Sequence, residues 1–422
     1  MHEFLISAVD FGSKKISASL GKEFEDDIDI LGTANTPSSG IEKGFIQDEE
    51  KCVISLKEAI HKLEQKTNKK IESVYCGISC RGLRITETNV SIILSEGKVR
   101  GIDLKKAIES NSEFTLLDGE EIVDTIINYY ILDEKILYEN IIGYRGNDLK
   151  INLTLVIGPK NELMKFKQVV KAAGYEFKGF IVNSIAGKNI FLQGKKSMGV
   201  KVIVDIGGGT TDISIFRNGV LKYIKSIKIG GNNITKDISI CGKLSLDESE
   251  NLKKILANKY ETILNDSEIN EELEVGATKI SKSLFYEVTK ARIEEILKYV
   301  NNEIKNTSFC EGMCSIIIYG DGITYYENVA RIAKEQIDKN ITIADSKYLQ
   351  MKNTANISSL AIVKEIFDRF KLIASDPVKD EFEVAINEKI NRDYDILEED
   401  ESIMDNEKGF FAKIKSFIKE IF

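Results

Sequence analysis

Histidine is scarce in this chain of 422 residues, and its six cysteines are scattered. The histidines are His2 and His61. Two cysteine pairs have a spacing of four, which could place two thiolates on one helical face: Cys76 with Cys80, and Cys310 with Cys314. A structural zinc ion takes about four nitrogen or sulfur ligands. Each pair supplies only two ligands, and the histidines that could complete a set are only His2 and His61, so we expect reduced structural thiols and no zinc.

Long apolar runs and an excess of basic residues are also missing. No run approaches the roughly 20 apolar residues of a spanning helix, and Asp10 interrupts the first apolar stretch. We therefore expect neither a transmembrane helix nor a secretory signal peptide. The formal net charge of −9 argues against a general nucleic-acid-binding protein, whose affinity comes from clustered Lys and Arg.

The acidity is concentrated near the C-terminus. Residues 376–408 hold thirteen Asp and Glu against four Lys and Arg, and Pro377 opens this stretch. It has few large apolar residues, so we expect a solvated linker that does not pack. The preceding 375 residues are nearly neutral.

The rest of the chain has the composition of a globular protein large enough for several lobes, with 42% apolar and 30% charged residues. Segments rich in Val, Ile and Thr alternate with helix-patterned ones, which indicates an α/β fold. The expected strands are Phe4–Asp10, Ser73–Ile78, Leu153–Ile157, Lys201–Asp205, Asp212–Phe216 and Ser315–Tyr319. The expected helices are Glu49–Thr67, Asn161–Ala173, Asp247–Leu256, Val288–Asn301 and Tyr325–Gln336.

Two stretches resemble each other and give the first functional clue. LISAVDFGSKKISASL and VKVIVDIGGGTTDISIF each predict a strand, an Asp-x-Gly turn and a second strand. Glycine lets backbone N–H groups approach phosphate oxygens, and a carboxylate suits Mg²⁺ and its waters. One such turn is most often a plain hairpin, but two copies suggest duplicated lobes that share a triphosphate.

These two turns resemble the phosphate motifs of the actin, heat-shock chaperone and sugar-kinase superfamily, which implies ATP with Mg²⁺ between two lobes. The resemblance implies Mg²⁺ at Asp10 and Asp205, with Asp212 as a further candidate. Either Lys14 or Lys15 would neutralise phosphate charge. The residues implied to cradle phosphate are Gly12, Ser13, Gly207, Gly208, Gly209, Thr210 and Thr211.

The third motif of the superfamily places glycines after a strand, beside adenosine. SIIIYGDGI stands in its place, which assigns Gly320 and Gly322 to the nucleotide. Members of the superfamily more often have paired glycines followed by Ala. Here Asp321 and Ile323 intervene, and a plain turn after a buried strand is the alternative.

A narrower resemblance is to the bacterial cell-division protein FtsA family. The segment SIKIGGNNITKDISICGKLSLDESENLKKILA is similar to the family's Gly-Gly turn followed by two helices, which implies Gly231 and Asn232 beside the ribose. YEVTKARIEEILKYV is similar to a family helix in which Arg292 and Glu295 would pair at i, i+3.

The family resemblance implies a two-lobed actin-like ATPase fold with duplicated ribonuclease-H-like subdomains and a relocated subdomain, called 1C, that contacts the next subunit of a filament. The implied bounds are 1–81 and 160–195 for 1A, 82–159 for 1C, 196–229 for 2A, 230–300 for 2B and 301–375 for the closing parts of 2A and 1A. An acidic linker, 376–408, and an amphipathic helix, 409–422, follow.

The last fourteen residues, GFFAKIKSFIKEIF, predict an amphipathic helix. On a wheel of about 100° per residue, the apolar side chains cover about 140° and every Lys lies outside that arc. A basic, Phe-rich helix behind a flexible linker favours docking on an anionic membrane surface over packing in the core. The apolar residues are Phe410, Phe411, Ile414, Phe417, Ile418, Ile421 and Phe422.

The FtsA resemblance implies a peripheral protein on the cytoplasmic face of the membrane at the division site. Its implied partners are the C-terminal tail of FtsZ on subdomain 2B, further copies of itself, anionic lipid and other division proteins. Alternatives are a pilus-assembly actin homologue such as PilM and a sugar or acyl kinase. Asn183 stands where the superfamily often has Glu or Gln to orient water, so we expect slow ATP turnover.

Overall fold

The computed structural model describes residues 4–24, 27–110, 114–192, 198–265, 272–344 and 356–374. The chain separates into two compact units. Unit 1 comprises Met1–Glu87, Thr115–Asn128 and Thr154–Phe367, and unit 2 comprises Thr88–Phe114, Tyr129–Leu153 and Asp368–Phe422. The predicted acidic linker and all seven predicted membrane-facing residues of the last helix lie outside the described residues.

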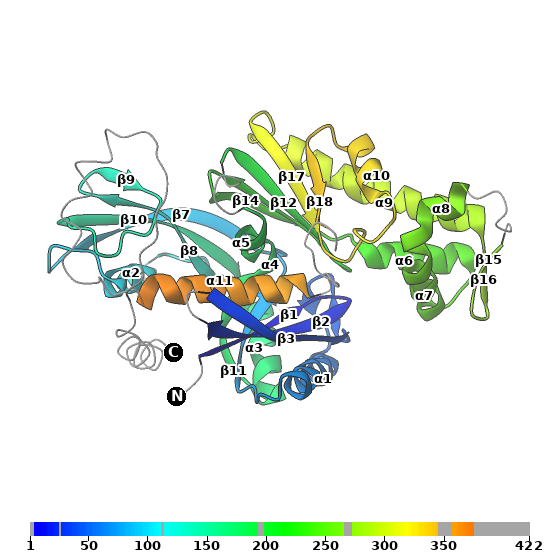
Figure 1. The fold of residues 1–422 in the computed structure, drawn as a ribbon, viewed down its shortest axis with the longest axis horizontal. Coiled ribbons are helices and arrows are strands. Elements are labelled where there is room, and N and C mark those ends of the chain that lie inside the picture. Colours follow the sequence, from blue (N-terminus) through cyan, green and yellow to red (C-terminus); the bar gives the residue numbers. More distant parts are fainter. Residues whose placement is uncertain are drawn as a thin grey trace, which may run out of the picture. The chain divides into compact units, whose positions relative to one another are not determined.

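Unit 1 contains a first five-stranded sheet in the order β11-β6-β1-β2-β3 (Figure 1). Its strands are β1 (Leu5–Phe11), β2 (Lys15–Phe24), β3 (Asp27–Pro37), β6 (Ser73–Ile78) and β11 (Glu176–Val182). The ribbon β4 (Ile41–Glu42) and β5 (Phe45–Ile46) follows β3, and α1 (Glu49–Thr67) and α3 (Lys160–Ala173) pack beside the sheet. Asp48 caps α1 by accepting a hydrogen bond from the Lys51 amide at 3.1 Å, which fixes where that helix begins.

Unit 1 also contains a second five-stranded sheet, in the order β14-β13-β12-β17-β18. Its strands are β12 (Val200–Ile206), β13 (Thr211–Arg217), β14 (Val220–Ile227), β17 (Met313–Tyr319) and β18 (Ile341–Ile343). The short helices α4 (Asn183–Ala186) and α5 (Lys188–Phe191) precede it, and α10 (Val329–Gln336) lies between β17 and β18 in the chain.

Between β14 and β17 the chain forms a mostly helical region of unit 1. It contains α6 (Gly231–Gly242), α7 (Leu246–Leu256), a 3-10 helix η3 (Ala257–Lys259), α8 (Tyr260–Asn265), the hairpin β15 (Glu272–Val275) and β16 (Thr278–Ser281), and α9 (Lys282–Lys305). Arg292 of α9 pairs with Glu295, as predicted, and also donates to Asp237 of α6 at 3.0 Å.

The central strand β12 is apolar on both faces because its residues alternate between two cores. Val202 and Val204 belong to the core around the second sheet and α9, whereas Ile203 belongs to the core around the first sheet and α1. Their exposed fractions are 0%. Burial on both faces explains the unbroken apolar run from which the strand was predicted.

Unit 2 holds part of a further sheet, in the order β7-β10-β8-β9, and one whole helix. The elements are β7 (Arg84–Ile93), α2 (Gly101–Glu109), β8 (Glu120–Leu132), β9 (Lys135–Leu137) and β10 (Asp148–Pro159). Four elements, β7, β8, β10 and α11 (Ile357–Ala374), run across the boundary between the units along the chain.

Every predicted strand and helix is present, and the α/β fold class is confirmed. The bounds differ where tertiary contacts decide them. The helix predicted from Tyr325 begins only at Val329, because Asn328 has a left-handed φ of 58° and the two tyrosines before it stack on each other. The Cys pairs do not share helical faces: Cys76 lies in β6 and Cys314 in β17. No helix of the described ranges is long and apolar enough to cross a membrane.

Candidate functional site

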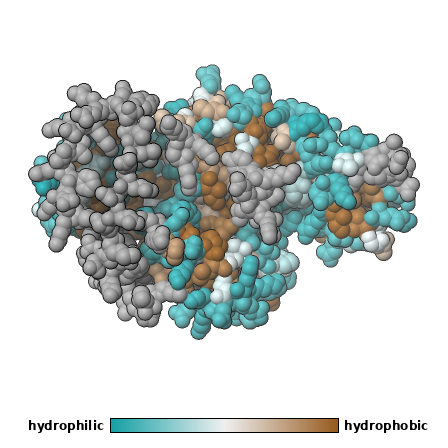
Figure 2. All heavy atoms as spheres, viewed as in Figure 1, coloured by the Kyte–Doolittle hydropathy of each residue, from teal (hydrophilic) through white to brown (hydrophobic). Residues whose placement is uncertain are grey.

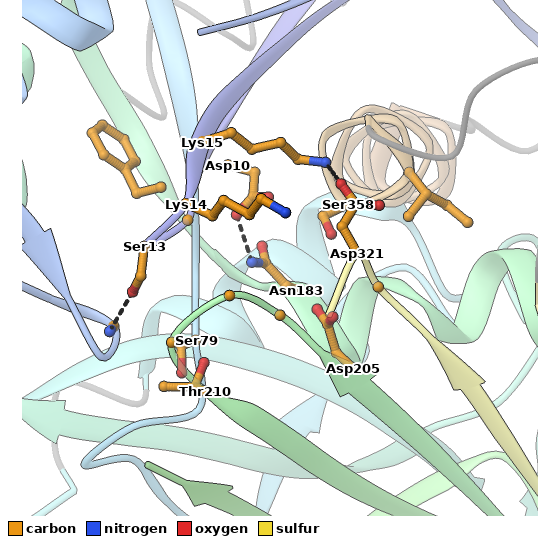
Figure 3. Close-up of a pocket in the computed structure, with 18 residues that line it drawn as sticks. Asp10, Ser13, Lys14, Lys15, Ser79, Asn183, Asp205, Thr210, Asp321 and Ser358 are labelled. Atoms are coloured by element: carbon orange, nitrogen blue, oxygen red, sulfur yellow. Dashed lines mark hydrogen bonds and ion pairs between the residues drawn. The ribbon is translucent and has the colours of Figure 1, made fainter. Parts of the chain in front are cut away.

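A pocket in unit 1 collects the turns at the ends of β1, β12 and β17 (Figure 3). Figure 3 shows Lys14 and Lys15 extending from the first hairpin, with Asp10 between them and Asn183 below. Its lining residues are Asp10, Phe11, Gly12, Ser13, Lys14, Lys15, Gly44, Ser79, Asn183, Asp205, Gly207, Gly208, Gly209, Thr210, Gly320, Asp321, Ile357 and Ser358.

The two predicted turns are equivalent in their pairing. In the first hairpin Phe11 pairs with Ile16, and in the second Ile206 pairs with Thr211, so each turn contains four residues. An aspartate stands one position before the end of each incoming strand. The internal duplication seen in the sequence is therefore a duplication of hairpins.

The second turn leaves its backbone open to the pocket. A Cβ added to Gly207 would meet only the Thr210 carbonyl oxygen, at 3.4 Å, whereas one on Gly208 would come within 2.6 Å of the Lys14 Cβ. The carbonyl oxygens of Gly207 and Gly208 accept hydrogen bonds from the amides of Gly231 and Asn232, at 2.9 and 2.8 Å. These bonds join the turn to the first residues of α6.

Asp10 is buried at the floor of the pocket, where Asn183 Nδ2 donates a hydrogen bond to its Oδ1 at 2.7 Å. Burial raises the pKa of Asp10 to about 6, against the lowering effects of Asn183 and Lys15. Asn183 Oδ1 is buried and has no hydrogen-bond partner among the described residues. An amide oxygen with no partner in the described part of the chain therefore lies next to the Asp10 carboxylate, and two oxygen groups of this kind suit a hydrated Mg²⁺ ion.

Asp205 occupies the equivalent position in the second hairpin. Burial, followed by the nearby charges of Asp212 and Asp10, raises its pKa well above the ordinary range. Asp212 pairs with Asp205 across the hairpin, but its side chain serves another purpose. It accepts hydrogen bonds from Ser79 Oγ and the Cys80 amide, both at 3.0 Å, and it does not line the pocket.

Each lysine that lines the pocket faces a carboxylate from the second half of the chain. Lys14 Nζ lies 2.8 Å from Glu250 of α7 and 5.6 Å from the centre of the Tyr325 ring. Lys15 Nζ forms an ion pair with Asp321. Burial is the largest influence on Lys15 and lowers its pKa to about 8.

A second polar cluster lies where α6 begins. Lys253 of α7 is fully buried, and its Nζ donates to the carbonyl oxygen of Gly231 at 3.0 Å and to Thr235 Oγ1 at 2.6 Å. Glu250 Oε2 is 2.6 Å from the same Nζ. Burial raises the pKa of Glu250, but Lys253 and Lys14 outweigh it and bring the value to about 2. A paired, ionised carboxylate therefore stands beside the predicted ribose residues.

The third turn is tightly packed against the second hairpin. A Cβ on Gly320, whose φ is 97°, would lie 2.4 Å from Asp205 Oδ1, and one on Gly322 would lie 2.6 Å from the Ile206 carbonyl oxygen. The Gly322 amide donates to that oxygen at 2.7 Å. Glycine is required at both positions, and Asp321 between them points its side chain to Lys15.

The structure brings most of the predicted residues together but not all. Eleven of the sixteen predicted nucleotide residues line the pocket. The other five lie behind the turns or beside the pocket: Thr211, Asp212, Gly231, Asn232 and Gly322. Sequence reasoning missed Glu250 and Lys253, whose Glu-x-x-Lys spacing on a helix was the available signal. It also missed Gly44 and Ser79, for which no local motif exists.

The sequence comparisons extend over most of this architecture. A family model described as Cell division protein FtsA matches residues 202–361. The chain is 30% identical over 313 residues to Cell division protein FtsA of Buchnera aphidicola subsp. Baizongia pistaciae, covering 72% of this chain and 73% of that one. The chain belongs to the FtsA family of cell-division proteins. It is also 27% identical to the FtsA of Bacillus subtilis over 368 residues, which cover 85% of this chain and 83% of the relative.

Solved structures agree on the fold of this FtsA family member. The PilM-PilN type IV pilus biogenesis complex matches 87% of this chain and 96% of its own, with a TM-score of 0.54 and 12% identity. The ethanolamine utilization protein EutJ from Carboxydothermus hydrogenoformans covers 86% and 90%, with a TM-score of 0.50 and 14% identity. The two-lobed actin-like fold predicted from the paired turns is confirmed, and a cell-division role follows from the family.

Proposed function

We propose that the pocket binds ATP with Mg²⁺, and that this binding supports a membrane-tethered filament that carries FtsZ in cell division. The observation that carries the proposal is the pairing of two equivalent four-residue turns, each behind a buried aspartate, around one pocket. Mg²⁺ would offset phosphate charge there, and Asp10 and Asp205 would hold it through its waters. Amides of the glycine turn would face the phosphates, and Glu250 and Lys253 would border the ribose.

A glycine variant tests nucleotide binding. Gly207→Val should abolish measurable ATP binding, because its side chain would project into the open part of the pocket while meeting only one protein atom near its Cβ. Binding is measured by calorimetry with Mg·ATP. Gly312→Ala is the matched control, since its Cβ would make an ordinary 3.6 Å contact with Val200 outside the pocket. Unchanged affinity in Gly207→Val would remove the second turn from the binding site.

Membrane attachment is proposed from the last fourteen residues. Their apolar arc contains four aromatic rings and is flanked by Lys413, Lys415 and Lys419. Burying a Phe side chain contributes roughly 1.5–3 kcal/mol, and each Lys near an anionic surface adds about 1 kcal/mol. The acidic stretch before them suits a tether that leaves the helix free to reach the cytoplasmic face of the membrane.

A reporter fused to residues 409–422 should bind anionic vesicles, and Phe417→Glu should release it. Phe417 lies on the apolar arc, so a carboxylate there loses the burial and adds a desolvation cost. Ser416→Glu is the control: it makes the same change of charge on the opposite side of the wheel. Vesicle sedimentation measures both. Equal release by the two variants would show that charge, and not an inserted apolar face, governs binding.

The partner surface is proposed on the helical region of residues 230–300, where the family resemblance places the FtsZ tail. Apolar surface shows here over α6 and α7 in Figure 2. Ile240 is 75% exposed and Leu246 is 54% exposed. Exposed apolar side chains beside polar ones suit a short peptide segment. Copies of the chain itself and other division proteins would use other surfaces.

Ile240→Glu should weaken binding of an FtsZ C-terminal peptide at least about tenfold, or about 1.4 kcal/mol, because a central apolar contact is lost. Fluorescence anisotropy of a labelled peptide measures this. Ile93→Glu is the matched control, since Ile93 of β7 is as exposed, at 86%, but lies outside the region. A peptide that binds Ile240→Glu as tightly as the parent would place the partner elsewhere.

A further inference from the structure

Asp321 is the residue that departs most from the pattern of the third turn. It stands between Gly320 and Gly322, two glycines that the packing requires. Its φ is not in the left-handed region, and 24% of its side chain is exposed. Nothing in the turn's own geometry calls for a carboxylate, which leaves its contacts to explain it.

Those contacts lead to the first hairpin. The Asp321 carboxylate accepts from Lys15 Nζ, 306 positions away in the chain, and both residues line the pocket. Figure 3 shows the Lys15 side chain extended toward Asp321 and away from Asp10. The other lysine of the pocket is held in the same manner, because Lys14 pairs with Glu250. Both cations that a phosphate chain would meet in this pocket already have carboxylate partners.

Charge in the pocket is therefore unfavourable for a polyphosphate. Its lining residues include three aspartates, Asp10, Asp205 and Asp321, against two lysines. Mg²⁺ would balance the negative charges of Asp10 and Asp205, whereas Asp321 forms its ion pair with Lys15. A phosphate group that uses Lys15 must displace a partly buried carboxylate, and a paired charge in such a place interacts more strongly than one in water.

We propose, resting on the proposed nucleotide function, that Asp321 is a specificity-determining residue: by holding Lys15 it weakens binding of polyphosphate nucleotides relative to uncharged adenosine. The Asp321 carboxylate competes with the phosphates for the Lys15 ammonium group. The chain consequently binds ATP less tightly than the same site with a neutral residue at this position.

The test compares ATP and adenosine on the full-length protein. Asp321→Asn, which keeps the shape of the side chain, should tighten Mg·ATP binding about tenfold or more and leave adenosine affinity unchanged, measured by calorimetry. Asp321→Ser should act in the same direction, so the test does not depend on one variant folding. Glu335→Gln on α10 is the control, since it removes a negative charge whose partner is Arg331, away from the pocket residues.

The role of Lys15 is tested separately. In the Asp321→Asn background, Lys15→Gln should remove the tenfold gain, whereas in the parent Lys15→Gln should change ATP affinity by less than about threefold. A gain that survives without Lys15, or an ATP affinity that is unchanged or weaker in Asp321→Asn, overturns the inference and leaves the nucleotide site standing. If neither the parent nor any variant binds ATP or adenosine, the proposed function fails as well, and the inference with it.

Discussion

The two hairpin turns share one backbone plan and differ in chemistry. In both hairpins, four residues separate the last paired residues of the two strands. An aspartate lies one position before the end of each incoming strand. The first turn, Gly12 to Lys15, carries two cations. The second, Gly207 to Thr210, carries none and consists mostly of glycine. Its cross-strand partner for the aspartate is Asp212, where the first hairpin has Ser17.

This difference shows how two copies of one hairpin can contribute different groups to the same pocket. The cationic turn supplies charge, and its lysines reach carboxylates of the second half, Glu250 and Asp321. The glycine turn supplies backbone groups and room. Glycine itself has different uses in the two turns: a Cβ on Gly12 would lie 2.7 Å from the Lys15 carbonyl oxygen, inside the turn, whereas one on Gly207 would meet only the Thr210 carbonyl oxygen, at 3.4 Å.

The largest expected effect is on the pH dependence of folding stability, where the two buried aspartates should differ from ordinary surface carboxylates. Burial raises the pKa of Asp10 from 3.8 to about 6. For an acid with a raised pKa, the folded state binds the proton more tightly, so stability falls as pH rises from about 4 to 6. Asp10→Asn should remove this loss, which amounts to about 3 kcal/mol. In EDTA without nucleotide, the variant should melt above the parent at pH 8 and close to it at pH 4.

Asp205→Asn should behave in the same way, because burial and the charge of Asp212 also raise the pKa of Asp205. Asp27→Asn, at a carboxylate that is 76% exposed, is the control and should show little pH-dependent gain. Differential scanning fluorimetry across pH 4–8 measures all three. A gain for Asp10→Asn that is the same at both ends of the range would contradict ionisation as its cause.

A smaller effect should distinguish the two glycines. Gly12→Ala should destabilise the protein by about 1–3 kcal/mol, since its methyl group collides with backbone. Gly207→Ala should stay within about 0.5 kcal/mol of the parent in the absence of nucleotide. Urea unfolding compares the two. Equal destabilisation would mean that the second turn needs its glycine for folding, and nucleotide results on Gly207 variants would then need a different explanation.

The fold was largely predictable because its signals are local. The strands on either side of each Asp-x-Gly turn follow from segments rich in Val, Ile and Thr, and α1 from Glu49 to Thr67 follows from helical spacing. The site was predictable where a motif marks the chain, as at Asp10, Gly207 and Gly320. The slow turnover expected from Asn183 stays a prediction, although its amide is engaged with Asp10.

Contacts between distant segments were not predictable from one sequence. In the sequence, Asp321 is only a departure from the superfamily's third motif, and its ion pair with Lys15 exists only in the folded chain. Lys253 has the sequence context of an ordinary helix residue, yet it is fully buried. The late start of α10 has the same origin, because Tyr325 and Tyr326 supply helical spacing while packing as a loop. Only the assembled sheets bring such residues together.

The hydrogen bonds that Ser79 and Cys80 donate to Asp212 also provide a way to measure local opening of the fold. The Cys80 thiol is buried against Ser184 Oγ at 3.1 Å, and burial, then Asp212, raises its pKa well above the ordinary range. An alkylating reagent therefore reacts there only after Ser79 and Cys80, which follow β6, separate from Asp212 of β13. Cys241, which is exposed, should react at once. Because Cys52 and Cys76 are buried as well, the labelling rate of Cys80 itself would report how often this contact opens, and how far a bound nucleotide slows its opening.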